Sequence, residues 1–163
     1  MENILFFDDE FKNNLRKKAK ESVRRRAHHN IHDNYADPVQ RLAIGLCYGT
    51  YIPPHKHIHE KQWEFFHLIE GVVKLIIFSE NGLVRNTHIL GDGESTFAIQ
   101  IPPNIIHTLV CLSDYSLIFE WKQGPFILSE AKVKPIWAKA EDDSNSLEIT
   151  KRLENCKVGD RYY

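Results

Sequence analysis

Two histidines one residue apart follow a double proline in the stretch GTYIPPHKHIHEKQWEFFHLIEG. Residues two apart on a strand point to the same side of a sheet, so His55 and His57 would present both imidazoles to one face. That arrangement can chelate a metal ion. The alternative is that His55, His57 and His59 are exposed loop residues.

A carboxylate and a third imidazole complete the candidate set. In a strand over WEFFHLI, Glu64, Phe66 and Leu68 share one face. A glutamate flanked by Phe66 and Leu68 on an inward face needs a positive partner, which a divalent cation would supply. Downstream, IPPNIIHTLVC predicts a turn and then a strand that points His107 inward. The predicted metal ligands are therefore His55, His57, Glu64 and His107.

Three imidazoles and one carboxylate are borderline donors that suit one divalent transition metal, namely Fe, Mn, Zn, Ni or Co. A metal with open positions serves as a Lewis acid or binds dioxygen together with a substrate. The donor set does not choose among these metals. If Glu64 is instead a carboxylate at the rim of a pocket, it has no such role.

The elements that must position these residues are strands. Between Leu42 and Trp121, short apolar or alternating segments are separated by Gly, Pro, Asn and Asp, and Asn81-Gly82 favours a tight hairpin. Seven strands at this spacing, with no helical segments between them, favour a mainly β sandwich or barrel. The predicted strands are LAIGLCYGTYI, WEFFHLI, VVKLIIF, LVRNTHIL, TFAIQIP, HTLVCL and SLIFEW.

The two ends of the chain differ from this centre. Apolar residues at spacings near four predict an amphipathic helix from Asp8 to Arg26, with Asp8 or Asp9 as its cap. The polar stretch that ends the chain predicts a peripheral helix or a loosely held tail. We therefore expect three parts: an N-terminal helix and arm over 1–38, a barrel over 39–128 and an extension over 129–163.

Charge and composition bound the partners. The 163 residues carry 21 basic and 22 acidic side chains, a formal charge of -1, so nothing global favours nucleic acid or an anionic membrane. The run Arg24 to Arg26 is more typical of a solvated helix end. We expect a small-molecule ligand, no signal peptide and no membrane span. Three scattered cysteines favour a reducing, cytoplasmic setting, with Cys47 and Cys111 in the core.

The histidine stretch resembles the first of the two cupin motifs, which is Gly, five residues, His-x-His, three or four residues, Glu, six residues, Gly. Gly49, His55, His57, Glu64 and Gly71 fit it, except that the gap from histidine to glutamate is two residues too long.

The second cupin motif is Pro-x-Gly, two residues, His, three residues, Asn. Pro102 and His107 fit its front half, with Asn104 at the glycine position and Cys111 at the final Asn. Asn best tolerates a left-handed backbone among the other residues, so the first change is mild. The resemblance implies a cupin double-stranded β-helix, a jelly-roll barrel with a bound metal, and a homodimer.

Most of the chain also resembles the WbuC family of cupin-fold metalloproteins. That family is associated with bacterial O-antigen and surface-polysaccharide gene clusters, so the resemblance implies this pathway. The residues that carry it belong to Asn-x-His, Val-Gln-Arg and Thr-Tyr-x-x-Pro-His-x-His segments: Arg26, Asn30, His32, Val39, Gln40, Arg41, Thr50, Tyr51, Pro54, His55 and His57.

Polar residues before the barrel are the candidate substrate-binding groups: Arg26, Asn30, His32, Gln40 and Arg41. An arginine among them could hold a carboxylate or phosphate in bidentate fashion, while the amides recognise hydroxyls, which would suit a sugar or sugar nucleotide. The alternative is structural: the amides satisfy backbone groups, and Arg41 pairs with Asp37 or Glu120.

These features favour a metal-dependent enzyme that acts on a small carbohydrate or sugar-nucleotide intermediate by isomerisation or epimerisation. Glu64 and Tyr51 are the candidate catalytic residues, since Tyr51 lies beside the histidines and could donate a proton. An Fe(II) dioxygenase fits the same donors. A binding or sensor cupin that holds a small ligand without turnover is the alternative from another class.

Overall fold

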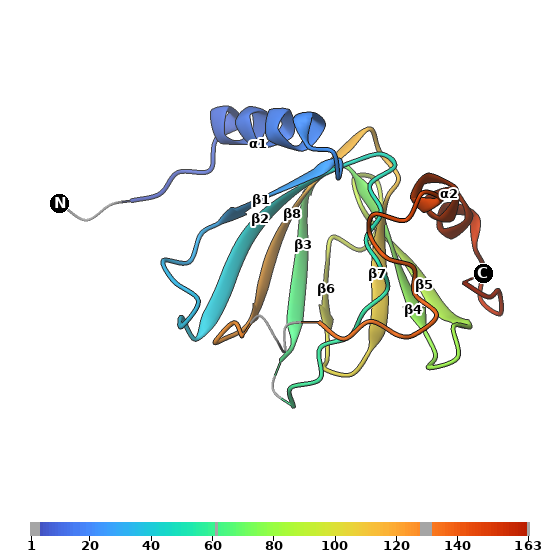
Figure 1. The fold of residues 1–163 in the computed structure, drawn as a ribbon. Helices are drawn as coiled ribbons and strands as arrows, with labels where there is room; N and C mark the ends of the chain where they lie inside the picture. Colours follow the sequence, from blue (N-terminus) through green and yellow to red (C-terminus); the bar gives the residue numbers. More distant parts are fainter. Residues whose placement is uncertain (1–3, 61, 128–131, 163) are drawn as a thin grey trace.

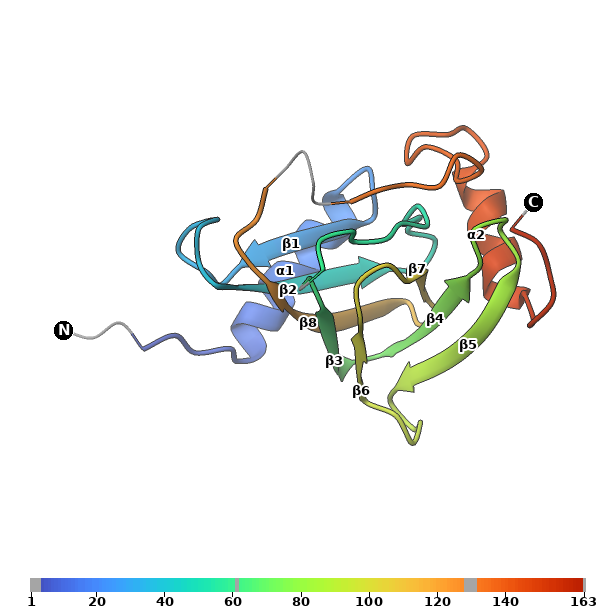
Figure 2. The same cartoon turned by 90° about the horizontal axis from the view of Figure 1, so that it is seen from below.

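Eight strands form two antiparallel sheets in the described part of this computed structural model, which covers residues 4–60, 62–127 and 132–162. One sheet has five strands in the order β1-β2-β8-β3-β6, and the other has three in the order β5-β4-β7. Figures 1 and 2 show the two sheets curving around a shared interior. The strands are β1 Arg26–Asn30, β2 Val39–Cys47, β3 Glu64–Glu70, β4 Val72–Phe78, β5 Val84–Gly91, β6 Ala98–Ile101, β7 Ile106–Cys111 and β8 Tyr115–Gln123.

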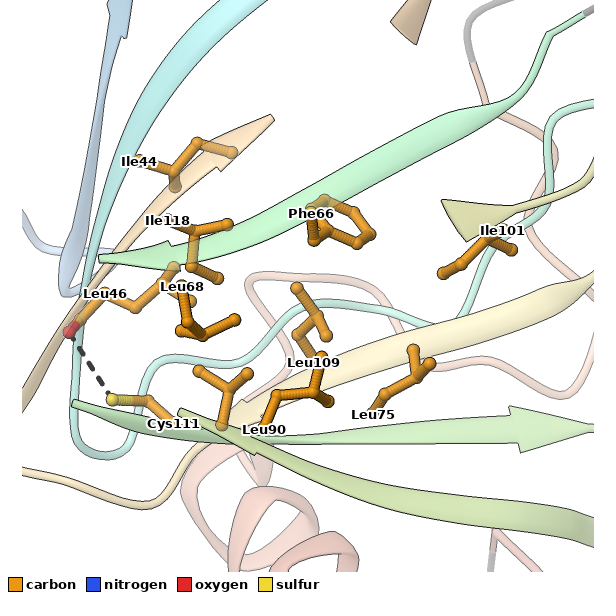
Figure 3. Close-up of a cluster of buried hydrophobic side chains, with 11 residues drawn as sticks. Ile44, Leu46, Phe66, Leu68, Leu75, Leu90, Ile101, Leu109, Cys111 and Ile118 are labelled. Atoms are coloured by element: carbon orange, nitrogen blue, oxygen red, sulfur yellow. Dashed lines mark hydrogen bonds between the residues drawn. The ribbon is translucent and has the colours of Figure 1, made fainter. Parts of the chain in front are cut away.

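Aliphatic side chains from both sheets fill one end of the interior (Figure 3). Leu46 and Ile118 come from the five-stranded sheet, Leu75 and Leu109 from the three-stranded sheet, and all four are buried. On the other face of β4, the side chains of Ile76 and Phe78 are also buried, in a second hydrophobic cluster. The run VVKLIIF is therefore apolar at every position except Lys74, because both faces of its strand are covered.

The helix α1, Asp9–Glu21, covers part of the outer face of the five-stranded sheet, over β1 and β2 (Figure 1). Asp8 caps it as predicted, because its side chain accepts a hydrogen bond from the backbone N–H of Phe11. Leu15 and Ala19 point into the sheet and are buried with Leu117 and its neighbours. This packing explains why α1 is amphipathic.

The helix ends at Glu21, before the basic run, whereas the apolar spacing predicts that it continues to Arg26. Arg25 has a φ of +56° and reverses the chain, and Arg26 then begins β1, a strand that the sequence did not reveal. A five-residue strand of RAHHN has little β-branched or apolar character, so local pattern could not identify it. Its pairing with β2 decides the conformation.

The polar C-terminal stretch contains α2, Ser146–Asn155, so the predicted peripheral helix is present. Leu153 packs into the cluster on the outer side of the three-stranded sheet. The Lys74 ammonium on β4 donates hydrogen bonds to the carbonyls of Leu153, Glu154 and Cys156 at the end of α2, at 3.1, 2.8 and 2.7 Å. A buried cation at a helix C-terminus satisfies free carbonyls and complements the helix dipole.

Tight turns join the sheets. Gly71 lies between β3 and β4 with a φ of +79°, and a Cβ there would lie 2.4 Å from the Tyr115 carbonyl oxygen, so only glycine fits this crossing between sheets. Asn81-Gly82 forms the predicted hairpin between β4 and β5. The prediction of a mainly β double sheet with an N-terminal helix and a C-terminal helix is confirmed, and this arrangement is a jelly-roll barrel.

Candidate metal centre and ligand cavity

The segment that carries the two histidines runs between β2 and β3 and is held against β7. The backbone N–H of His55 donates to the carbonyl of His107 at 3.1 Å, and the N–H of His107 donates back to His55 at 2.9 Å. The N–H of Asn104 donates to the carbonyl of His57 at 2.7 Å. Asn104 has a φ of +65°, as its place in the motif predicts. The turn before β7 thus fixes both histidines.

Backbone carbonyls also orient two of the imidazoles. Nδ1 of His55 lies 2.8 Å from the carbonyl oxygen of Pro53, and Nδ1 of His107 lies 2.9 Å from that of Ile105. Because a carbonyl oxygen only accepts, each Nδ1 carries a proton and donates it. Nε2 of each ring therefore faces the interior, which is the usual way in which a second hydrogen bond orients a metal-ligating histidine.

The Glu64 carboxylate meets these rings at the first residue of β3. Its Oε1 lies 2.8 Å from Nε2 of His57, and its Oε2 lies 3.1 Å from Nε2 of His107. The ligand atoms of His55, His57 and Glu64 all lie within 4.8 Å of one another. The long gap between histidine and glutamate does not keep Glu64 away, and all four candidate ligands are buried.

Electrostatics favour a cation at this point. Burial by itself raises the pKa of the Glu64 carboxyl, but its close contacts with the imidazoles of His107 and His57 outweigh burial and hold that pKa well below its usual range. Burial, and then the positive charge of Lys132, lower the pKa of His55 well below its usual range. The site therefore combines an ionised carboxylate with a neutral imidazole, the protonation states that bind metals.

The residues present fit a divalent transition metal. Two ligand atoms at about 2.1 Å from a common ion, at right angles, are about 3 Å apart, which matches the separations between Glu64 and its two histidines. Among the described residues, Nδ1 of His57 is buried and has no hydrogen-bond partner. The cluster can hold one such ion, with nitrogen and oxygen donors suited to Fe, Mn, Zn, Ni or Co.

Beside this cluster lies a cavity of about 280 Å³. Its volume is at the lower end of small-molecule sites, and its walls combine apolar and charged groups as such sites do. The aliphatic lining comes from β2, β7, β8 and the segment before His55, and the ionisable lining comes from both sheets and the C-terminal segment. The lining residues are Arg24, Arg26, His28, Ile44, Leu46, Ile52, His55, Glu64, Phe66, His107, Leu109, Ile118, Glu120, Lys132 and Glu141.

Glu120 is a cavity residue that sequence reasoning missed. It is buried, and Lys122, two residues further along β8, lies 2.8 Å from its carboxylate and shares its inward face. The alternating residues Phe119 and Trp121 are large and apolar, so the sequence pattern of β8 favours solvent, not the cavity, for Glu120 and Lys122. The one indication in the sequence is that Glu120 stands two residues after Ile118, a core residue, and so shares the inward face of the strand with it. A buried carboxylate in a cavity wall can accept or deliver a proton.

Other missed residues come from the chain ends. His28 and Arg24 line the cavity from β1 and the turn before it. Glu141 reaches it from the C-terminal segment. Only the tertiary fold brings residues 24–28 and 141 to one place, so no local pattern could have assigned them.

The predicted substrate-binding residues divide into two groups. Arg26 lies on the cavity wall and is buried. Four others are not among the lining residues: Asn30, His32, Gln40 and Arg41. No observation here tests the ligand-binding roles of the five, which stay predictions.

The polar residues outside the cavity have structural partners. The amide of Gln40 donates to the carbonyls of Asn34, Tyr35 and Asp37, at 3.0 Å for the last. The Arg41 guanidinium lies 3.4 Å from the Asp37 carboxylate. Nδ1 of His32 lies 3.1 Å from the backbone nitrogen of Arg41. These contacts match the structural alternative weighed for Gln40 and Arg41.

Tyr51, the predicted proton donor, is buried in the cluster on the outer side of the three-stranded sheet. Its hydroxyl lies 2.5 Å from that of Tyr162 and donates to the carbonyl of Lys139 at 3.1 Å. Burial, and then the hydrogen bond with Tyr162, raise the pKa of Tyr51. The structure does not place Tyr51 among the cavity residues, and its catalytic role stays a prediction.

Solved structures share this fold at low sequence identity. An oxalate oxidase in complex with the substrate analogue glycolate is 13% identical, with a TM-score of 0.53 over 71% of this chain and 57% of its own. Protein SO0799 from Shewanella oneidensis is 13% identical, with a TM-score of 0.53 over 66% and 72%. The conserved SPY1581 protein of unknown function from Streptococcus pyogenes is 11% identical, with a TM-score of 0.51 over 78% and 93%.

With the two sheets described above, this likeness defines the class of the protein, which has the cupin jelly-roll fold. The chain spans little more than half the length of the oxalate oxidase chain. Residues 7–90, just over half of the sequence, match the family described as Domain of unknown function (DUF6016), and the chain belongs to that family.

No curated protein matches the chain in sequence. No helix within residues 4–60, 62–127 and 132–162 is long and apolar enough to cross a membrane.

Proposed function

We propose that this protein is a metal-dependent cupin that binds a small molecule in the cavity, with His55, His57, Glu64 and His107 holding one divalent transition metal. One observation carries the proposal. Nε2 of His107 faces a carboxylate oxygen of buried Glu64 at 3.1 Å, while Nδ1 of His107 already donates to a carbonyl. Two acceptors this close repel one another unless a proton or a cation lies between them.

The chemistry proposed is enzymatic. A bound metal would polarise a carbonyl or hydroxyl of the ligand. The chain itself contributes the apolar wall formed by Ile44, Phe66 and Ile118, which excludes water from the ligand, and the carboxylate of Glu120, which can move a proton within the cavity. Glu64 is proposed chiefly as a ligand, and its use as a proton-transfer group stays a prediction. Arg26 on the same wall supports a ligand that bears a carboxylate or phosphate.

The substrate class follows the family resemblance. We propose a small carbohydrate or sugar-nucleotide intermediate of O-antigen biosynthesis, supported by the WbuC-like segments. The three-part division of the chain, the homodimer and the cytoplasmic location also stay predictions.

Oxygen consumption with candidate substrates would separate a dioxygenase from an isomerase, and ligand-induced stabilisation without any product would favour a binding protein.

Elemental analysis tests the metal. Protein purified without added metal should contain about one transition-metal ion per chain, as a single closed cluster of ligands predicts. The variant His55→Ala/His57→Ala should contain almost none, because two of the four donors are gone. His59→Ala is the matched control, since His59 belongs to the same segment but is exposed, and it should keep its metal.

Circular dichroism would establish that the double variant is folded. If the folded double variant retains as much metal as the wild type, the assignment of this cluster is wrong.

A further inference from the structure

Glu141 forms an ion pair at the mouth of the cavity with two arginines from the opposite end of the chain. Its carboxylate lies 2.5 Å from the Arg26 guanidinium and 3.5 Å from that of Arg24. The side chain of Arg26 is 8% exposed and that of Glu141 is 33% exposed. A partly solvated carboxylate therefore occupies the donor face of a buried guanidinium inside a ligand cavity.

The Arg26 guanidinium is held in place independently of Glu141. Its Nη1 donates to the carbonyl of Tyr51 at 2.8 Å, and it lies 3.5 Å from the hydroxyl of Thr50. Tyr51 and Thr50 lead directly into the segment that carries His55. A planar guanidinium fixed on one side keeps its other N–H groups available in a preset direction, which suits recognition of a carboxylate or phosphate.

The outer part of the cavity has more cationic than anionic groups. A space of about 180 Å³ there is lined by Arg26, Lys132 and Lys134, with Glu141 as the single carboxylate among its described lining residues. This space shares Arg26, His55 and Glu141 with the larger cavity. The deeper carboxylates have partners of their own, since Glu64 contacts two histidines and Glu120 contacts Lys122.

We propose that this outer space binds the anionic group of the ligand, a carboxylate or a phosphate, and that Glu141 occupies the same position until the ligand displaces it. The inference rests on the proposed function, since it places the ligand in that cavity beside the metal. Glu141 lies in a turn outside the helices and strands, so its side chain can leave Arg26 without breaking a strand ladder. A phosphate, with its greater charge, should compete better than a carboxylate.

Removal of the internal competitor should strengthen anion binding. We would titrate the full-length protein with inorganic phosphate and, separately, with malonate, and follow the heat of binding. Glu141→Gln should bind the preferred anion about fivefold more tightly than the wild type, because the competing ion pair is lost. Asp142→Asn is the matched control: it removes the same charge at the next, exposed position and should change the affinity less than about twofold.

Loss of the cationic partner should have the opposite effect. Arg26→Gln should weaken anion binding, and Arg24→Gln, at a more exposed position, provides a second variant if Arg26→Gln does not fold. Equal affinities in Glu141→Gln and the wild type would overturn the proposal. So would equal gains in Glu141→Gln and Asp142→Asn, because they would indicate only a general effect of charge.

The same titrations separate this inference from the metal. They would be repeated with the metal-free His55→Ala/His57→Ala variant, combined with Glu141→Gln. A gain from Glu141→Gln that persists there supports the anion site even if the metal assignment fails. If Glu141→Gln keeps its metal but binds the anion no more tightly than the wild type, the anion site is rejected and the metal assignment stands. Tighter binding of phosphate than of malonate would identify the anionic group as phosphate, and the reverse as carboxylate.

Discussion

The two ends of the barrel interior are built on the same strands but carry opposite chemistry. Along β3, the inward side chains change from the ionisable Glu64 at one end to the aliphatic Leu68 near the other, and along β7 they change from His107 to the core residue Cys111. On β8 the order is reversed, because the strand is antiparallel, and Ile118 precedes Glu120. One end therefore holds the ionisable cluster and the other holds the aliphatic core shown in Figure 3.

This contrast separates stability from chemistry within one small domain. At the apolar end, the burial of Val73, Leu75 and Leu90 contributes the free energy that holds the two sheets together. At the polar end, the buried charges of Arg26 and Glu120 each lie against an opposite charge, which limits the cost of desolvation without adding much stability. The two ends should therefore respond differently to substitution.

Truncation at the apolar end should have the largest effect. Leu75 is fully buried, so Leu75→Ala should lower the free energy of unfolding by about 4 kcal/mol, from lost burial and the cavity left behind. Chemical denaturation would measure it, with Ile89→Ala at a half-exposed site on β5 as the control. The folded variant should keep its metal, and a loss of metal at full folding would show that the two ends are not independent.

The ion pair beside the cavity should give the next largest effect. Lys122→Met leaves the buried carboxylate of Glu120 without its cation and should lower the free energy of unfolding by about 3 kcal/mol. The double variant Glu120→Leu/Lys122→Met should return to within about 1 kcal/mol of the wild type, because it buries no unpaired charge. A double variant as unstable as the single one would show that this pair is needed for the fold.

Alkaline pH should lower the free energy of unfolding by a smaller amount, through Cys111 at the apolar end. Burial raises the pKa of the Cys111 thiol to about 11, above its ordinary value of 9.0. A raised pKa in the folded state contributes stability that is present below pH 9 and is lost as the pH rises through 11. We expect a loss of about 2 kcal/mol for this group. The fall in unfolding free energy between pH 9 and pH 11 should be shallower in Cys111→Ala, and equal slopes would contradict the assignment.

Much of the fold and of the candidate site could be predicted because each depended on local patterns. Period-2 alternation placed Glu64, Phe66 and Leu68 on one inward face, and all three are buried in the described strand. The Asp8 cap, the Asn81-Gly82 hairpin and the positive φ of Asn104 each follow from the conformational preferences of one or two residues. Such preferences are short-ranged, so the sequence states them directly.

The sequence by itself thus determined the seven strands β2 to β8, the two histidines one residue apart, and the separate segments that carry Glu64 and His107. Only the tertiary structure decided that Glu120 faces the cavity, that Arg26 starts a strand, and that Glu141 meets Arg26 from 115 positions away in the chain. The outer face of β8 is apolar because α1 and neighbouring aromatic rings contribute to cover it, so the usual pattern of a polar outer face is reversed around Glu120. Contacts between distant segments depend on packing, and packing leaves no period in the sequence.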